Sequence, residues 1–133
     1  MNYVVIPARW SSSRLPGKPL KKIGSKPMIQ WVYESCRKSD ADFIFIATDS
    51  EEIRDQVLEF NGQVIMTSVD HKTGTDRIHE AITKINCHEE DLIINVQGDE
   101  PFISHDDINI WIHNYNNDFE RATLYKELKK EDI

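Results

Sequence analysis

The sequence predicts an α/β protein with a mostly parallel sheet and helices on both faces. Short apolar segments alternate along the chain with segments whose apolar residues recur at helical spacing. The apolar segments are rich in Val, Ile and Phe, which is typical of strands covered on both faces. Strands that alternate with helices are usually joined by right-handed crossovers, which make the strands parallel. The predicted architecture is therefore Rossmann-like.

The chain is predicted to open with a strand and a helix. Tyr3–Ile6 is β-branched and aromatic, so we expect a buried strand. A helix is expected over Pro27–Ser39, because proline suits a first helical turn and Ile29, Val32 and Cys36 recur at helical spacing.

A second strand and helix follow. Phe43–Ala47 is a continuous apolar run, which is typical of a strand buried on both faces. The next helix is expected to bury Ile53, Val57 and Phe60 and to end at Asn61–Gly62 in the manner of a C-cap. The side chains that can cap its start are Thr48, Asp49 and Ser50.

The rest of the chain continues the alternation. We expect strands over Gln63–Met66 and Leu92–Val96, and helices over Asp76–Ile85 and residues 104–114. Ala122–Tyr125 is interpreted as a fifth strand, followed by a charged tail without any closing apolar element.

Composition excludes several classes of function. The 133 residues fit a single domain, and the net charge of −7 disfavours non-specific binding to nucleic acid or to anionic membranes. No apolar run approaches the length of a membrane span, and no signal peptide precedes the first strand. Cys36 and Cys87 are far apart and are expected to be reduced thiols. We therefore expect a cytoplasmic protein.

The segment Pro7–Leu20, directly after the first strand, is the strongest functional signal. It concentrates Arg9, Arg14 and Lys18 in a chain that is acidic overall, with prolines that limit its conformations. It has neither the glycines and Ser/Thr of a Walker A loop nor a G-x-G-x-x-G fingerprint. Cations held at the end of a buried strand suit a polyphosphate ligand, although solvated loop cations are the ordinary alternative.

A second candidate position is Asp99, which follows the strand over Leu92–Val96. Gly98 before it and Pro101 after it indicate a fixed turn. An aspartate held there can give Mg²⁺ a hard oxygen ligand, with substrate phosphates and water completing the coordination. A role as a turn former or helix cap is the competing interpretation.

The third candidate segment precedes the helix over Asp76–Ile85. Gly74 allows a ligand to approach the backbone closely, and Thr75 or Asp76 can cap the helix. Arg77 lies in the first turn, where a cation is unfavourable beside the helix dipole. We therefore expect a partner for Arg77, either Asp76, Asp99 or a ligand.

Together these segments resemble the 3-deoxy-manno-octulosonate (KDO) cytidylyltransferases, also called CMP-KDO synthetases. The motifs stand in the family's order and approximate spacing: PARWSSSRLPGKPL (7–20), ATDSEEI (47–53), MTSVDHKTGTDR (66–77) and NVQGDEP (95–101). The resemblance implies the nucleotide-diphospho-sugar transferase type of fold. It also implies transfer of CMP from CTP to the anomeric hydroxyl of KDO, with Mg²⁺, for lipopolysaccharide synthesis.

The resemblance also implies roles for individual residues. Arg14 and Lys18 would hold the triphosphate and offset charge on the leaving pyrophosphate, and Asp99 would carry Mg²⁺. The residues implied to border the cytosine are Ala8, Arg9, Gly74, Thr75, Arg77 and Gln97.

Members of that family are nearly twice this length. We therefore expect the chain to be the nucleotide-binding half of one α/β domain, without the sugar-binding half and with little activity alone. The full-length family is expected to form homodimers. Two alternatives stay open, namely a cytidylyltransferase for another acidic sugar and a non-catalytic nucleotide-binding remnant.

Overall fold

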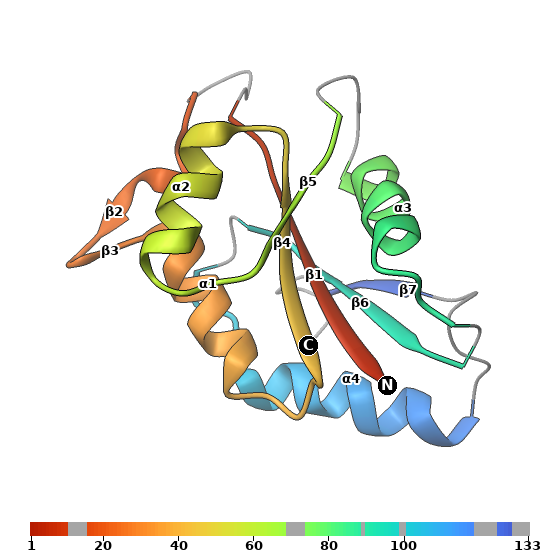
Figure 1. The fold of residues 1–133 in the computed structure, drawn as a ribbon. Helices are drawn as coiled ribbons and strands as arrows, with labels where there is room; N and C mark the ends of the chain where they lie inside the picture. Colours follow the sequence, from red (N-terminus) through yellow and green to blue (C-terminus); the bar gives the residue numbers. More distant parts are fainter. Residues whose placement is uncertain (11–15, 69–73, 89, 99–100, 119–124, 129–133) are drawn as a thin grey trace.

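The computed structural model describes residues 1–10, 16–68, 74–88, 90–98, 101–118 and 125–128. Within these ranges the centre of the molecule is a five-stranded sheet in the order β5-β4-β1-β6-β7, and every neighbouring pair is parallel (Figure 1). The strands are β1 (Asn2–Ala8), β4 (Phe43–Thr48), β5 (Val64–Met66), β6 (Leu92–Val96) and β7 (Tyr125–Leu128). The predicted α/β class and parallel sheet are therefore confirmed.

Helices cover both faces of this sheet. They are α1 (Met28–Arg37), α2 (Glu51–Glu59), α3 (Gly74–Lys84) and α4 (His105–Asp118). Buried residues of α1, α2 and α4 share one apolar cluster, whereas α3 belongs to a separate cluster on the opposite face. The chain order places β1 in the middle of the sheet, with the crossovers turning first toward β5 and then toward β7.

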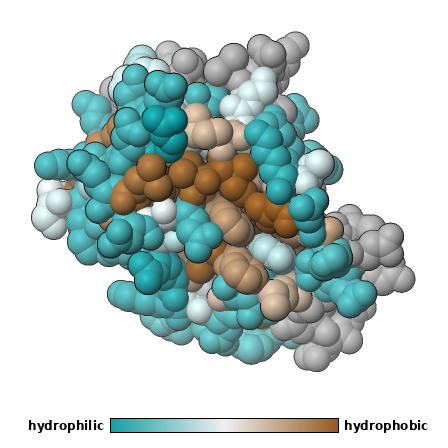
Figure 2. All heavy atoms as spheres, in the orientation of Figure 1, coloured by the Kyte–Doolittle hydropathy of each residue, from teal (hydrophilic) through white to brown (hydrophobic). Residues whose placement is uncertain are grey.

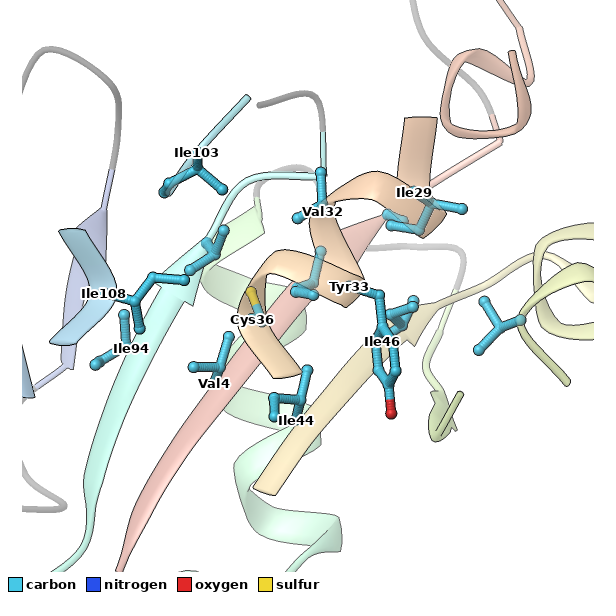
Figure 3. Close-up of a cluster of buried hydrophobic side chains, with 14 of the residues drawn as sticks. Val4, Ile29, Val32, Tyr33, Cys36, Ile44, Ile46, Ile94, Ile103 and Ile108 are labelled. Carbon is cyan, nitrogen blue, oxygen red and sulfur yellow. The ribbon is translucent and has the colours of Figure 1, made fainter. Parts of the chain in front are cut away.

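The larger core lies between α1 and the sheet. Figure 3 shows α1 side chains, including Val32 and Cys36, pointing onto strand residues such as Val4 and Ile94. Successive strand residues point to opposite faces, so Val5 lies in the α3 cluster instead. This double burial explains why the strands were readable as continuous apolar runs.

The α3 face is covered less completely than the α1 face. Tyr3 stacks on Phe43 and Phe45 there, with ring centroids 5.2 and 6.4 Å apart, and Phe43 keeps 36% of its surface exposed. In the same orientation as Figure 1, Figure 2 shows apolar residues gathered over the middle of the molecule.

The start and end of α2 follow the predicted chemistry. Ser50 is the N-cap, since its Oγ accepts a hydrogen bond from the Ile53 N–H at 3.2 Å. Asn61 follows the helix with a left-handed φ of 64°, and the Gly62 N–H bonds the Val57 carbonyl at 2.9 Å. Among the predicted caps, the structure therefore selects Ser50.

Several boundaries differ from the prediction. Pro27 is the N-cap of α1, in extended backbone, and not a first-turn residue. It also belongs to a hairpin of β2 (Lys22–Ile23) and β3 (Lys26–Pro27), which the sequence analysis missed because strands this short show no periodicity. The short 3₁₀ helix η1 (Lys18–Leu20) was missed for the same reason.

The last predicted strand, Ala122–Tyr125, is described only at Tyr125, because residues 122–124 lie outside the described residues. The structure has β7 at Tyr125–Leu128, so part of the segment predicted to be a charged tail is a strand. Its backbone pairs with β6 from Ile93↔Tyr125 to Val96↔Leu128. Strand pairing, and not local hydrophobicity, decides the position of this element.

Other predictions concern single side chains. Cys36 and Cys87 are not paired with each other; burial raises the pKa of both thiols, that of Cys87 to about 11. Thr75 and Asp76 lie inside α3, so neither is its cap. Among the described residues, the structure contains no helix that is long and apolar enough to cross a membrane.

Candidate functional site

The carboxyl ends of four described parallel strands define one edge of the sheet. The register places Ala8 beside Thr48, and Thr48 beside Met66, while β6 ends nearby at Val96 on the other side of β1. The three segments singled out from the sequence each follow one of these strands. They therefore meet at the same edge, which is where ligands bind in open parallel sheets.

The ends of β1 and β6 are in direct contact. Gly98 is buried, and a Cβ added to it would lie 3.0 Å from the Pro7 carbonyl oxygen and 3.6 Å from Ile6. Only a glycine lets the turn after β6 approach the backbone of β1 this closely. The contact holds Gln97 next to the segment that contains Ala8 and Arg9.

Gln97 takes part in a polar pair with a residue of β6. Its Nε2 donates a hydrogen bond to Asn95 Oδ1 at 3.3 Å, and Asn95 is fully buried. Among the described residues, the Nδ2 group of Asn95 is a buried donor without a hydrogen-bond partner. Polar groups are thus concentrated at the carboxyl end of a strand that is otherwise apolar.

The basic segment after β1 is closed by contacts at its two ends. The Gly17 N–H donates to the Trp10 carbonyl at 2.7 Å, and the Trp10 ring packs against Gly17, which has a φ of 73°. Lys18 then begins η1, which the buried Pro19 fixes to the body of the molecule. Arg9 is exposed, and Arg14 lies outside the described residues.

Arg77 is almost fully buried, although it carries a charge. Its Nη1 donates to Thr67 Oγ1 and, at 3.2 Å, to the Ser68 carbonyl, while Nη2 lies 3.2 Å from Asp49 Oδ2. Asp76, Asp99 or a ligand was expected as its partner. The ionic partner among the described residues is instead Asp49, which the sequence analysis considered only as a helix cap.

Carboxylate side chains are the ligands expected for Mg²⁺ at this site. Asp99 and Glu100 lie outside the described residues, so the position expected to carry Mg²⁺ is not described. Within the described ranges, no group of three or more His, Cys, Asp or Glu side chains is arranged to hold a metal ion. Asp49 is engaged by Arg77 and is not available as a simple ligand.

This architecture is shared with known nucleotidyltransferases. A structure of 4-diphosphocytidyl-2C-methyl-D-erythritol synthase superposes with a TM-score of 0.70 at 18% identity, covering 88% of this chain and 55% of that one. At this identity the similarity concerns the fold alone. The chain belongs to the cytidylyltransferase family, whose sequence model matches residues 3–132.

The most informative relatives share one name. The chain is 55% identical over 104 residues to the 3-deoxy-manno-octulosonate cytidylyltransferase of Saccharophagus degradans, covering 77% of this chain and 41% of that protein. It is 50% identical over 132 residues to the enzyme of the same name from Fusobacterium nucleatum, covering 97% and 53%. The chain therefore spans about half the length of the curated relatives it matches, and the family resemblance predicted from the motifs is confirmed.

A solved structure of CMP:2-keto-3-deoxy-manno-octonic acid synthetase in complex with CTP is also similar. It is 42% identical and superposes with a TM-score of 0.83, covering 88% of this chain and 48% of that one. This chain therefore shares its fold with a protein whose structure was solved in complex with CTP.

Proposed function

We propose that this chain is the nucleotide-binding part, residues 1–133, of a 3-deoxy-manno-octulosonate cytidylyltransferase. Together with a sugar-binding part, it would transfer CMP from CTP to the anomeric hydroxyl of KDO and release pyrophosphate. The observation that carries the proposal is the similarity to a synthetase in complex with CTP, at 42% identity with 88% of this chain covered. A cytoplasmic location and homodimers of the full-length enzyme are implied by the resemblance and stay predictions.

The proposed roles follow the chemistry of phosphoryl transfer. Such catalysis depends on positioning and on electrostatic stabilisation, and it requires no protein nucleophile. Lys18 and Arg14 would hold the triphosphate, with Lys18 presented by η1. Five residues would border the cytosine: Ala8, Arg9, Gly74, Thr75 and Gln97. Direct contact between Arg77 and the cytosine also stays a prediction, and the Arg77 guanidinium donates to Thr67, Ser68 and Asp49.

Asp99 is the residue we propose for Mg²⁺. The ion usually binds through one or two carboxylates together with substrate phosphates, so a site of this kind needs no cage of protein ligands. The chemistry of Asp99 suits this arrangement, because its carboxylate is a hard oxygen donor. Asp99 directly follows Gly98, which packs against the backbone of β1. When bound, the ion would neutralise charge on the phosphates.

Calorimetry with Mg·CTP tests the nucleotide-binding proposal. Lys18→Ala is expected to weaken binding about 10- to 100-fold, because a hydrogen bond to a charged group is worth about 1.5–3 kcal/mol. Asp99→Ala should weaken it as well. Lys38→Ala is the matched control. It removes the same charge from an exposed position at the C-terminal end of α1. Absence of binding by well-folded protein, or equal losses in Lys18→Ala and Lys38→Ala, would contradict the proposal.

Pyrophosphate release from CTP plus KDO tests the second part of the proposal. We expect little turnover by the 133-residue chain, because most contacts to the sugar acid are assigned to the other half. Turnover at the rate of a full-length relative measured side by side would show that this assignment is wrong.

A further inference from the structure

The Asp49–Arg77 ion pair connects three elements at the candidate nucleotide site. Asp49 follows β4, Thr67 and Ser68 follow β5, and Arg77 belongs to the first turn of α3. The Arg77 side chain is 3% exposed and that of Asp49 is 13% exposed. The pair is therefore an interior contact at the carboxyl edge and not a surface salt bridge.

The pair also solves an electrostatic problem of α3. A buried cation in the first turn of a helix is unfavourable, both because it is desolvated and because it lies beside the positive end of the helix dipole. Asp49 neutralises this charge, and Thr67 and Ser68 accept two further N–H groups. Three of the five N–H groups of the guanidinium are thus bonded to acceptors of the protein.

Contacts further along α3 keep the helix aligned on β5. Glu80 accepts a hydrogen bond from the Ser68 N–H at 3.0 Å, and Lys84 Nζ donates to the Met66 carbonyl at 2.5 Å. Lys84 and Glu80 also form an ion pair at 2.9 Å. Of these contacts, those of Arg77 lie nearest the helix start, so they hold the end of α3 that carries Gly74 and Thr75.

We propose that Arg77 is a positioning residue, and that its ion pair with Asp49 sets the position of Gly74 and Thr75 against the base of the nucleotide. The inference rests on the proposed function, since it assumes that the carboxyl edge binds CTP. The inference gives Asp49, in the ATDSEEI segment, a role in holding Arg77. The sequence analysis had considered Asp49 only as a helix cap. Gly74 lies about one helical turn before Arg77, so a displacement of Arg77 would also displace the backbone of Gly74.

Asp49→Asn separates this role from direct nucleotide contact by the sign of its effect. If Arg77 contacted CTP itself, removal of the neighbouring carboxylate would release the guanidinium and remove a repelling charge, so Mg·CTP would bind as well or better. If Arg77 positions α3, Asp49→Asn weakens Mg·CTP binding by about fivefold or more, within the usual range for coupled sites. Arg77→Lys should also weaken Mg·CTP binding. A lysine lacks the planar guanidinium that contacts three acceptors at once.

Inorganic tripolyphosphate supplies a readout that general damage to the fold would not reproduce. The proposal places Gly74 and Thr75 at the base, so both variants should bind tripolyphosphate with Mg²⁺ within about twofold of the parent chain while losing affinity for CTP. Amide chemical shifts of Gly74 and Thr75 should move in the free variants. Equal losses for CTP and tripolyphosphate would overturn the assignment to the base side.

Asp91→Asn is the matched control. Asp91 is also a buried carboxylate in an ion pair, but it lies at the opposite edge of the sheet, 3.0 Å from the Met1 amino group. Its variant should lose stability and keep the parent affinity for Mg·CTP, measured at a temperature where each protein is folded. Unchanged or tighter CTP binding by Asp49→Asn would overturn the inference, whereas failure of the parent chain to bind CTP would instead refute the proposed function.

Discussion

The two edges of the sheet use polar residues in different ways. At the amino edge, polar groups satisfy one another and the strand ends: Asp91 binds the Met1 amino group, and Asp42 accepts the Asn2 N–H at 2.7 Å. At the carboxyl edge, polar groups join segments that follow different strands, as Asp49 and Arg77 do. The amino edge therefore closes the fold, whereas the carboxyl edge arranges a site.

This contrast has a measurable consequence. Substitutions at the amino edge should change the free energy of unfolding without changing nucleotide affinity. Substitutions at the carboxyl edge should change affinity where the residue helps to hold the proposed nucleotide site, with or without a loss of stability. Variants from both edges therefore test whether the two edges differ in function.

Gly98→Ala is expected to have the largest effect of this set. The new methyl group would meet the Pro7 carbonyl at 3.0 Å, so the turn after β6 must move away from β1. Overpacking of this kind costs about 1–3 kcal/mol of unfolding free energy. Because Gln97 and Asp99 flank this glycine, Mg·CTP affinity should fall as well. Urea unfolding and calorimetry measure the two effects, and a stability loss with unchanged affinity would contradict a role for this contact in the site.

Asp91→Asn should have a smaller effect, confined to stability. Burial alone would raise the pKa of the Asp91 carboxyl, but hydrogen bonds from the His88 N–H and the Met1 amino group outweigh it and lower that pKa. At neutral pH the variant should lose about 1–2 kcal/mol of unfolding free energy.

The pH dependence of this loss has a defined sign. A lowered pKa in the folded state gives stability that is complete above the unfolded value, about 3.9, and disappears as the pH falls through the folded value. The difference between the parent chain and Asp91→Asn should therefore shrink below about pH 4. Urea unfolding measured between neutral and acidic pH checks this, and a difference that grows in acid would contradict the account.

Ser50→Ala should have the smallest effect. Ser50 follows β4 at the carboxyl edge, yet its Oγ is used to cap α2, by accepting from the Ile53 N–H. Loss of such a cap costs about 1 kcal/mol. Thermal unfolding should show this loss while Mg·CTP affinity stays constant. A large fall in affinity would mean that the nucleotide site includes the start of α2.

Most of the fold could be predicted from sequence because the strands are buried on both faces. Leu92–Val96 was predicted at its observed bounds, and the apolar stripe of α1 was readable from Ile29, Val32 and Cys36. The β2–β3 hairpin and β7 could not be located in this way. Strands of two residues lack periodicity, and the position of β7 depends on pairing with β6.

The place of the candidate site in the fold was also predictable from the sequence, but not all of its contacts were. The parallel order alone indicates that the motif segments share an edge, and the strand pairing confirms this arrangement. The partner of Arg77 was not predictable, because Asp49 lies 28 residues away and meets it only through the crossover after β4. One signal was present: Asp49 directly follows β4, and Arg77 lies at the start of the helix after β5, so both are expected at the same edge. The roles of Arg14 and Asp99, which lie outside the described residues, stay predictions.

Nuclear magnetic resonance titration of the isotope-labelled chain with Mg·CTP tests the central claim most directly. The account predicts that amide shifts change at Ala8, Arg9, Lys18, Gly74 and Gln97, all on segments of the carboxyl edge. It predicts constant shifts at Asp42 and Asp91, at the amino edge. Shift changes centred on the amino edge, or no saturable changes at all in a folded chain, would contradict the account.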